Sequence, residues 1–241
     1  MHVPGLSGFS ADTIDDLVFA AMVMLGLGLS HTRVGKPLAW AETFYHELSH
    51  GIICILTGGK IDHITLSFNG AGCCYTRGGW RIPTLLAGYA GSALWGGVLF
   101  MAGWLLGDHG ATTWLKVELG VMAFVLVVWA RDWRTWVILL TLGGFYGAAV
   151  LIRDVHYMPL ILQFMGIYVL LNAIRAPLFL IDGQHVGDGA MLADIFHILP
   201  EGIWIALWFA FALLVMGVCM YLTLPDFKAV AEPVLVWAGV I

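Results

Sequence analysis

The chain has 241 residues, of which 60% are hydrophobic and only 11% charged, and its formal net charge is −5. Soluble domains carry about 25% charged residues, so this chain has too few charges to cover a globular surface in water. The composition excludes a soluble enzyme and a disordered chain, and the acidic balance leaves no basic footprint for a nucleic acid. A polytopic membrane protein remains, and we treat residues 1–241 as a single membrane-embedded domain with the lipid bilayer as its partner.

Seven segments are predicted to be membrane helices, because each is mostly apolar and near the length of about 20 residues that a span requires. In chain order they cover residues 17–29, 38–57, 82–107, 114–130, 135–152, 157–174 and 202–224. Three tryptophans, Trp129, Trp133 and Trp136, surround the polar turn between the fourth and fifth segments and are typical of a membrane interface. The 11 Lys and Arg residues divide almost evenly between the two sides of this arrangement, so the positive-inside rule predicts no orientation.

Residues 60–81, between the second and third apolar segments, have the pattern of a β-hairpin. Ile64, Leu66 and Phe68 alternate with polar residues, and a period of two is typical of a strand. An Asn-Gly pair follows at positions 69 and 70 and is the strongest short signal for a hairpin turn. The predicted fold is therefore an all-α polytopic bundle of about seven transmembrane helices with a small β-hairpin insert.

The second apolar segment contains His46-Glu47-Leu48-Ser49-His50, an HExxH pattern. Residues four apart share one face of a helix, so His46 and His50 can offer two imidazoles to one metal ion. Glu47 lies about 100° round the helix and can touch a water on that metal without being a ligand. This is how a zinc-bound water is activated and a carboxylate takes its proton. The alternative is an interhelical hydrogen-bond cluster without a metal, because ionisable residues in lipid must face a cavity or each other.

A catalytic zinc also needs a third protein ligand and an open position for water. Asp188 and Asp182 are the main candidates, since each precedes a glycine that lets the carboxylate stand clear of the backbone. Asp188 is also consistent with a helix N-cap, and Asp182 with a turn residue. His185 and His197 are further candidates in the same polar region.

Three other features surround the HExxH pattern. Glu42 precedes His46 by one helical turn, and it could hydrogen-bond an imidazole or face water at the helix entry. Cys54 follows His50 by one turn, but a buried free thiol is commonly just a small hydrophobic group. The third apolar segment has a small-residue face that lets helices approach closely. This face consists of Gly88, Gly91, Ser92, Gly96 and Gly97.

With these residues, the chain resembles the intramembrane zinc metallopeptidases of the site-2 protease group, and more narrowly their compact B-like branch. The resemblance runs from residue 39 to about residue 208. Four features carry it: the HExxH followed by Gly51; the stretch 57–61 with the strand-like insert; the small-residue run 87–91; and the stretches 172–175 and 187–193, followed by Pro200 and Trp204.

The resemblance implies an aspartate as the third ligand, in a Leu-Asp-Gly or, in the B-like branch, a Ser-Asp-Ala context. Gly187-Asp188-Gly189 resembles the second context although its serine is missing, and Ile181-Asp182-Gly183 loosely resembles the first. Asp188 is therefore the favoured ligand and Asp182 the alternate.

Together these residues predict a zinc-dependent endopeptidase that cleaves a membrane-embedded or membrane-associated protein. His46, His50 and Asp188 would hold Zn²⁺, and Glu47 would pass a proton from water to the leaving amine. Because a membrane helix bonds all its peptide groups internally, the substrate must unwind before cleavage. The strand of Ile64, Leu66 and Phe68 could bind the unwound segment by edge pairing, or the hairpin could simply plug the bundle.

Two other functional classes remain open from the residues alone. One is a non-catalytic membrane pseudo-protease or metal-binding scaffold that keeps the helix without the chemistry. The other is a transporter that uses the buried acids and histidines as a proton or metal path. The absence of an internal inverted repeat argues against the transporter.

Overall fold

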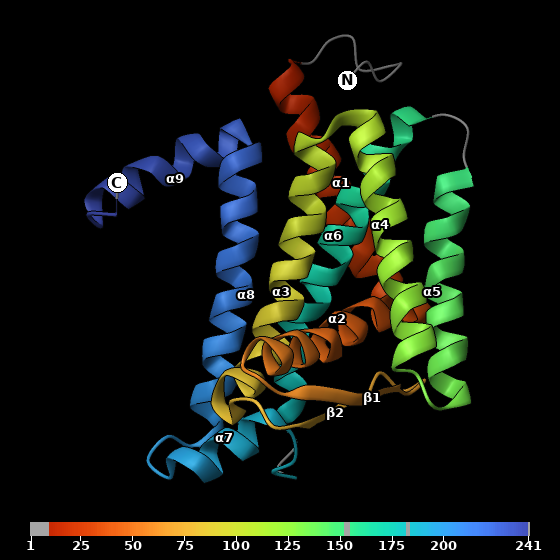
Figure 1. The fold of residues 1–241 in the computed structure, drawn as a ribbon. Helices are drawn as coiled ribbons and strands as arrows, with labels where there is room; N and C mark the ends of the chain where they lie inside the picture. The colour runs from red at the N-terminus through yellow and green to blue at the C-terminus, as the bar shows by residue number, and fades with distance from the viewer. Residues whose placement is uncertain (1–9, 152–154, 182–183, 241) are drawn as a thin grey trace.

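The computed structural model describes residues 10–151, 155–181 and 184–240. Within them, nine α-helices and one two-stranded sheet follow each other along the chain (Figure 1). The elements are α1 (Ala11–Ser30), α2 (Gly35–Leu56), β1 (Lys60–Leu66), β2 (Gly72–Arg77), α3 (Arg81–Leu105), α4 (Gly107–Val128), α5 (Trp133–Leu151), α6 (Met158–Arg175), α7 (Asp188–Phe196), α8 (Glu201–Thr223) and α9 (Pro225–Trp237).

Six helical segments in the described residues are long and apolar enough to cross a membrane. They cover residues 13–30, 81–105, 107–128, 133–151, 155–180 and 201–223. Figure 1 shows α3, α4, α5, α6 and α8 standing side by side as a bundle. The prediction of an all-α polytopic membrane fold is confirmed.

The structure differs from the prediction at α2, which we expected to be a seventh span. Helix α2 lies across one end of the bundle instead of running along it (Figure 1). It buries several polar side chains, among them Glu42, Glu47 and His50. Such groups are costly in lipid, and α2 avoids this cost by packing against α3, the hairpin and α6.

The hairpin is where the sequence places it. Strands β1 and β2 pair antiparallel, with Ile64 opposite Cys74 and Leu66 opposite Gly72. The other edge of β1 is bonded to the end of α4 and the first turn of α5. The Ile64 N–H donates to the Trp129 carbonyl at 3.0 Å, and the Leu66 N–H donates to Thr135 Oγ1 at 2.7 Å. The hairpin is therefore bonded to the bundle, and the outer edge of β2 pairs with no further strand among the described residues.

The small-residue face of α3 is confirmed as a packing surface. A Cβ added to Gly96 would lie 2.9 Å from the Leu170 backbone nitrogen of α6, and one added to Gly166 would lie 2.3 Å from that of Phe100. These backbones touch because neither glycine carries a side chain. The closely packed α3–α6 pair forms the centre of the bundle, and α2 lies against it (Figure 1).

Helix α7 lies at the same end of the bundle as α2 and the hairpin (Figure 1). Its Leu192 is fully buried against Leu85 of α3 and against Trp204 and Trp208 of α8. This apolar contact fixes the first residues of α7 relative to the face of α3 that α2 covers. It thereby brings Asp188, the first residue of α7, to the HExxH helix.

Candidate metal centre

Helix α2 places the two histidines of the HExxH pattern on one face, as expected. The imidazole rings of His46 and His50 are 4.7 Å apart between centroids, and their Nε2 atoms are 3.0 Å apart. The two side chains are 13% and 9% exposed. Both ligand atoms therefore point into one confined space, away from bulk water.

Asp188, at the first position of α7, completes this cluster. Its Oδ2 lies 3.2 Å from His46 Nε2 and 3.1 Å from His50 Nε2. Gly187 precedes it with φ of 111°, a conformation that a residue with a side chain rarely adopts. The turn at this glycine aims the carboxylate at α2. Asp182, the alternate ligand, lies outside the described residues.

The three atoms fit a zinc ion. They are the donors that zinc uses in catalytic sites, two imidazole nitrogens and a carboxylate oxygen. At metal–ligand distances of about 2.0–2.2 Å, the corners of a tetrahedron lie about 3.3 Å apart. The observed separations of 3.0, 3.1 and 3.2 Å are close to that spacing. Three protein ligands also leave a fourth position for water or substrate.

The backbone of α3 orients His50. The Thr84 carbonyl oxygen lies 2.6 Å from His50 Nδ1, which donates its proton to it. A proton on Nδ1 leaves the Nε2 lone pair free to bind a metal. The ring of Tyr89, five residues further along α3, packs edge-on against the His46 ring, with the ring centroids 4.4 Å apart. Nothing in the sequence pattern predicted the role of Thr84, because its contact is made by the backbone.

Glycines make room for the cluster. A Cβ on Gly88 would lie 2.5 Å from the Nε2 atoms of both His46 and His50, and a Cβ on Gly91 would lie 2.1 Å from Ser49 Oγ. Helix α3 therefore lies directly against the candidate ligand atoms. The sequence predicted a packing role for this face, but it did not predict that Gly88 borders the ligand atoms.

Glu47 lies beside the cluster without joining it. Its side chain is 5% exposed and is covered by the start of β2. A Cβ on Gly72 would lie 2.6 Å from Glu47 Oε1, and the carboxylate faces the backbone N–H of Cys74. The group of atoms that could hold one metal contains His46, His50 and Asp188 only, among the residues described. Glu47 is therefore a neighbour of the possible ligand atoms and not one of them.

The remaining acidic and histidine candidates have other partners or surroundings. Glu42 is buried, with an Oε1 atom that has no hydrogen-bond partner, so it does not face water at the helix entry. His185 pairs with Glu201 at 2.8 Å. His197 ends α7 with a left-handed backbone, outside the group of possible ligands.

The thiols near the site are poor competitors for a metal. Cys54 Sγ faces the Lys60 and Gly78 carbonyls at the base of the hairpin, away from the histidines. Burial raises the pKa of the Cys73 thiol, and the nearby Glu47 carboxylate raises it further. The same two causes raise the pKa of Cys74. None of these cysteines belongs to the group of described residues whose atoms could hold one metal ion.

The structure corrects the predicted substrate strand. The side chains of Ile64 and Leu66 are buried in the core, and their backbone N–H groups are already bonded to Trp129 at the end of α4 and to Thr135 of α5. Phe68 follows β1 and is exposed, and its ring contacts Trp40 and Trp133. An incoming segment therefore finds no open edge on β1 at Ile64 and Leu66, whereas the outer edge of β2 pairs with no further strand among the described residues.

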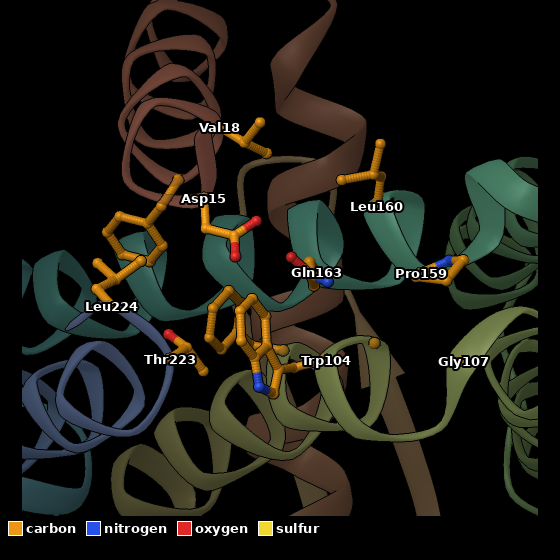
Figure 2. A pocket seen from close by; sticks show the side chains of 12 residues that line it. Asp15, Val18, Trp104, Gly107, Pro159, Leu160, Gln163, Thr223 and Leu224 are labelled. Atoms are coloured by element: carbon orange, nitrogen blue, oxygen red, sulfur yellow. The ribbon is translucent and has the colours of Figure 1, made fainter. Parts of the chain in front are cut away.

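A separate cavity of about 250 Å³ lies at the other end of the bundle, between α1, α3, α6 and α8 (Figure 2). Asp15 and Gln163 lie on one side of it, and Trp104 and Thr223 lie across from them. No histidine or cysteine is among its described lining residues. Among the described residues, the one group of atoms that could hold a metal ion lies at the end formed by α2, the hairpin and α7.

The comparison with protein families gives one match. A family model described as Peptidase M50B-like matches residues 18–219, which include the HExxH pattern, the hairpin and Asp188. No curated protein and no solved structure matches the chain.

Proposed function

The chain belongs to the M50B-like peptidases, and on this basis we propose that it is a zinc-dependent intramembrane endopeptidase. Membership makes it a membrane metallopeptidase of the site-2 protease type, and its six apolar segments make it an integral, multi-pass membrane protein. Zinc as the metal, the ligand set and a membrane protein as the substrate are the parts that we propose.

One observation carries the proposal. The ligand atoms of His46, His50 and Asp188 meet within 3.0–3.2 Å of one another, although Asp188 is 142 residues distant from His46 in the chain. An HExxH helix alone could be a hydrogen-bonded cluster. The presence of a third donor, a carboxylate oxygen, at the spacing expected around zinc supports a metal site with an open position.

The residues divide the chemical work between them. A zinc ion held by His46, His50 and Asp188 would polarise the scissile carbonyl and acidify a water molecule. Glu47 takes the proton of the attacking water and delivers it to the leaving amine. Its neighbours suit this role, because β2 covers the carboxylate and confines it to the space beside the ligands.

The substrate is proposed to bind as an extended segment along β2. A membrane helix must be unwound before a peptide bond in it is accessible, and an exposed strand edge can hold the unwound part by backbone hydrogen bonds. The outer edge of β2 pairs with no further described strand, and its residues Gly72 and Cys74 lie against Glu47. The Cys74 N–H bonds Glu47, so a bound segment would take over this donor from the carboxylate. A segment paired there runs past the base and the ligands.

The test is the Glu47→Gln variant, compared with wild-type protein in detergent micelles. Wild-type protein is expected to bind about one zinc ion and to cleave a membrane-helix substrate. E47Q is expected to bind the same amount of zinc and to lose cleavage, because Gln cannot accept the proton.

Three outcomes would contradict the proposal. Cleavage by E47Q at the wild-type rate would exclude Glu47 as the base. Zinc binding without cleavage by the wild type would favour a non-catalytic scaffold. Metal flux into liposomes without proteolysis would favour a transporter.

A further inference from the structure

Glu118 is a buried acid in the middle of a membrane-spanning helix, far from the metal in sequence. It belongs to α4 and is 1% exposed. A carboxyl group at this depth is costly, and it is retained only where neighbours satisfy it or a function requires it. The proposed function as described above gives it no role.

The partners of Glu118 connect it to the HExxH helix. Tyr45 of α2 donates its hydroxyl to Glu118 Oε2 at 3.0 Å, and Trp114 donates its Nε1–H to Oε1 at 3.1 Å. The Tyr45 hydroxyl also lies 3.3 Å from that of Tyr146 on α5. The Tyr45 ring stacks on Trp95 of α3, with centroids 5.3 Å apart. Residues of three spanning helices, α3, α4 and α5, therefore hold the Tyr45 side chain.

We propose that Glu118 is a positioning residue for the metal centre. Through Tyr45 it fixes the rotation of α2 about its own axis, and with it the Nε2 atoms of His46 and His50. Tyr45 directly precedes His46, so its side chain leaves the helix about 100° away from the first ligand. A tether on that side opposes rotation of the ligand face. This inference rests on the proposed zinc site.

The magnitudes show why a metal centre would need this tether. An imidazole Nε2 lies roughly 6 Å from the helix axis, so a rotation of about 10° displaces it by about 1 Å. Metal–ligand distances tolerate only about 0.2 Å. Because α2 lies across the end of the bundle, its rotation depends on side-chain contacts such as this one.

The chain provides a matched control. Tyr168 of α6 is also a buried tyrosine whose hydroxyl bonds α2, donating to the Gly35 carbonyl at 2.8 Å. Gly35 is the first residue of α2, eleven positions before His46. Tyr45→Phe and Tyr168→Phe each remove one oxygen atom and leave the ring. If the Tyr45 hydroxyl only stabilised the fold and did not position the ligands, Y45F and Y168F would have the same zinc affinity.

The experiment measures zinc affinity by competition with a chelator, on full-length protein in micelles, together with cleavage kinetics at saturating zinc. Y45F is expected to bind zinc about 10–100-fold more weakly, as for other residues that orient a ligand. At saturating zinc it should show a lower kcat with an unchanged KM. Y168F should match the wild type in both. E118L should resemble Y45F, whereas E118Q, which keeps groups that can bond Tyr45 and Trp114, should recover most of the affinity.

Wild-type zinc affinity and kcat in Y45F would overturn the inference, and so would equal losses in Y45F and Y168F. Either result leaves the proposed function intact if the wild type cleaves and E47Q does not. A wild type that neither binds zinc nor cleaves would instead overturn the proposed function, and this inference with it.

Discussion

The two ends of the bundle differ in how they use polar residues. At the end formed by α2, the hairpin and α7, the polar side chains of His46, His50 and Asp188 converge on one point. At the other end, Asp15 and Gln163 border a cavity without any histidine or cysteine among its described lining residues (Figure 2). The same bundle thus carries a dense, buried polar cluster at one end and a cavity lined mainly by apolar side chains at the other.

The basic residues are also distributed unevenly between the two ends of the bundle. We call the end formed by α2, the hairpin and α7 the metal end. Of the ten Lys and Arg residues in the described part of the chain, eight lie in these elements, in the connections at this end, or at the ends of the spanning helices that meet it. They are Arg33, Lys36, Lys60, Arg77, Arg81, Arg131, Arg134 and Arg175. The expectation of an even split was wrong because it treated α2 as a span, which moved every later loop to the wrong side.

The largest effect is expected from Gly88→Ala. Its Cβ would lie 2.5 Å from both ligating nitrogens, so the imidazoles must move and zinc affinity should fall by about 100-fold or more. At the opposite end, Gly103→Ala brings a Cβ to 2.6 Å from the Pro159 carbonyl. G103A should lower the melting temperature and leave the zinc affinity of the folded protein unchanged. Chelator competition and thermal unfolding separate the two, and equal zinc loss in both would show that the ends are not independent.

The next largest effect is expected from a comparison of two aspartate substitutions, one at each end of the bundle. Asp188→Ala removes the only oxygen donor of the cluster and should reduce zinc affinity at least 10-fold and abolish cleavage. Asp15→Ala alters the distant cavity and should leave both unchanged. Zinc content and cleavage of the purified variants check this. Normal zinc binding by D188A would mean that another group, such as Asp182, supplies the third ligand.

The third prediction concerns orientation. By the positive-inside rule, the eight basic residues at one end predict that this end, with the candidate metal centre, faces the cytoplasm. In a background without Cys73, Trp80→Cys at the metal end should resist a membrane-impermeant maleimide applied to intact cells. Trp237→Cys, in α9 at the other end, should react. Both side chains are well exposed, at 69% and 89%, so burial does not explain a difference. The reverse labelling would invert the assigned topology.

The smallest effect is expected at Asp132, which caps α5 beside the hairpin. Partial burial opposes its charge, but hydrogen bonds from Thr135 and Arg134 outweigh this and lower the pKa of the carboxyl. A pKa that is lower in the folded state means that its stabilisation is present above the unfolded value, near 3.9, and is lost as pH falls below it.

Asp132→Ala should therefore cost about 1 kcal/mol at neutral pH, a shift of about 2–4 °C in melting temperature. The difference from wild type should disappear in acid. Thermal unfolding measured from pH 7 downward follows this loss, and a difference that stays constant as the pH falls through and below the unfolded pKa would exclude a charged cap.

Much of this molecule was predictable because short-range patterns encode it. The alternation of Ile64 and Leu66 with polar residues predicted the hairpin, and the four-residue spacing of His46 and His50 placed both on one helix face. The predicted spans were confirmed wherever a segment was uniformly apolar. The sequence pattern did not show that the outer edge of β1 is occupied, because this depends on hydrogen bonds to the distant residues Trp129 and Thr135.

The sequence by itself determined the two histidines, the adjacent glutamate and the membrane bundle, because these depend on helical periodicity and on apolar length. Only the tertiary structure decided that α2 lies across the bundle and that Asp188 reaches it. Both outcomes depend on contacts between segments far apart in the chain. Helix α2 can keep its polar groups out of lipid only because α3, α6 and the hairpin cover it, and Asp188 arrives only because α7 packs on α3 and α8.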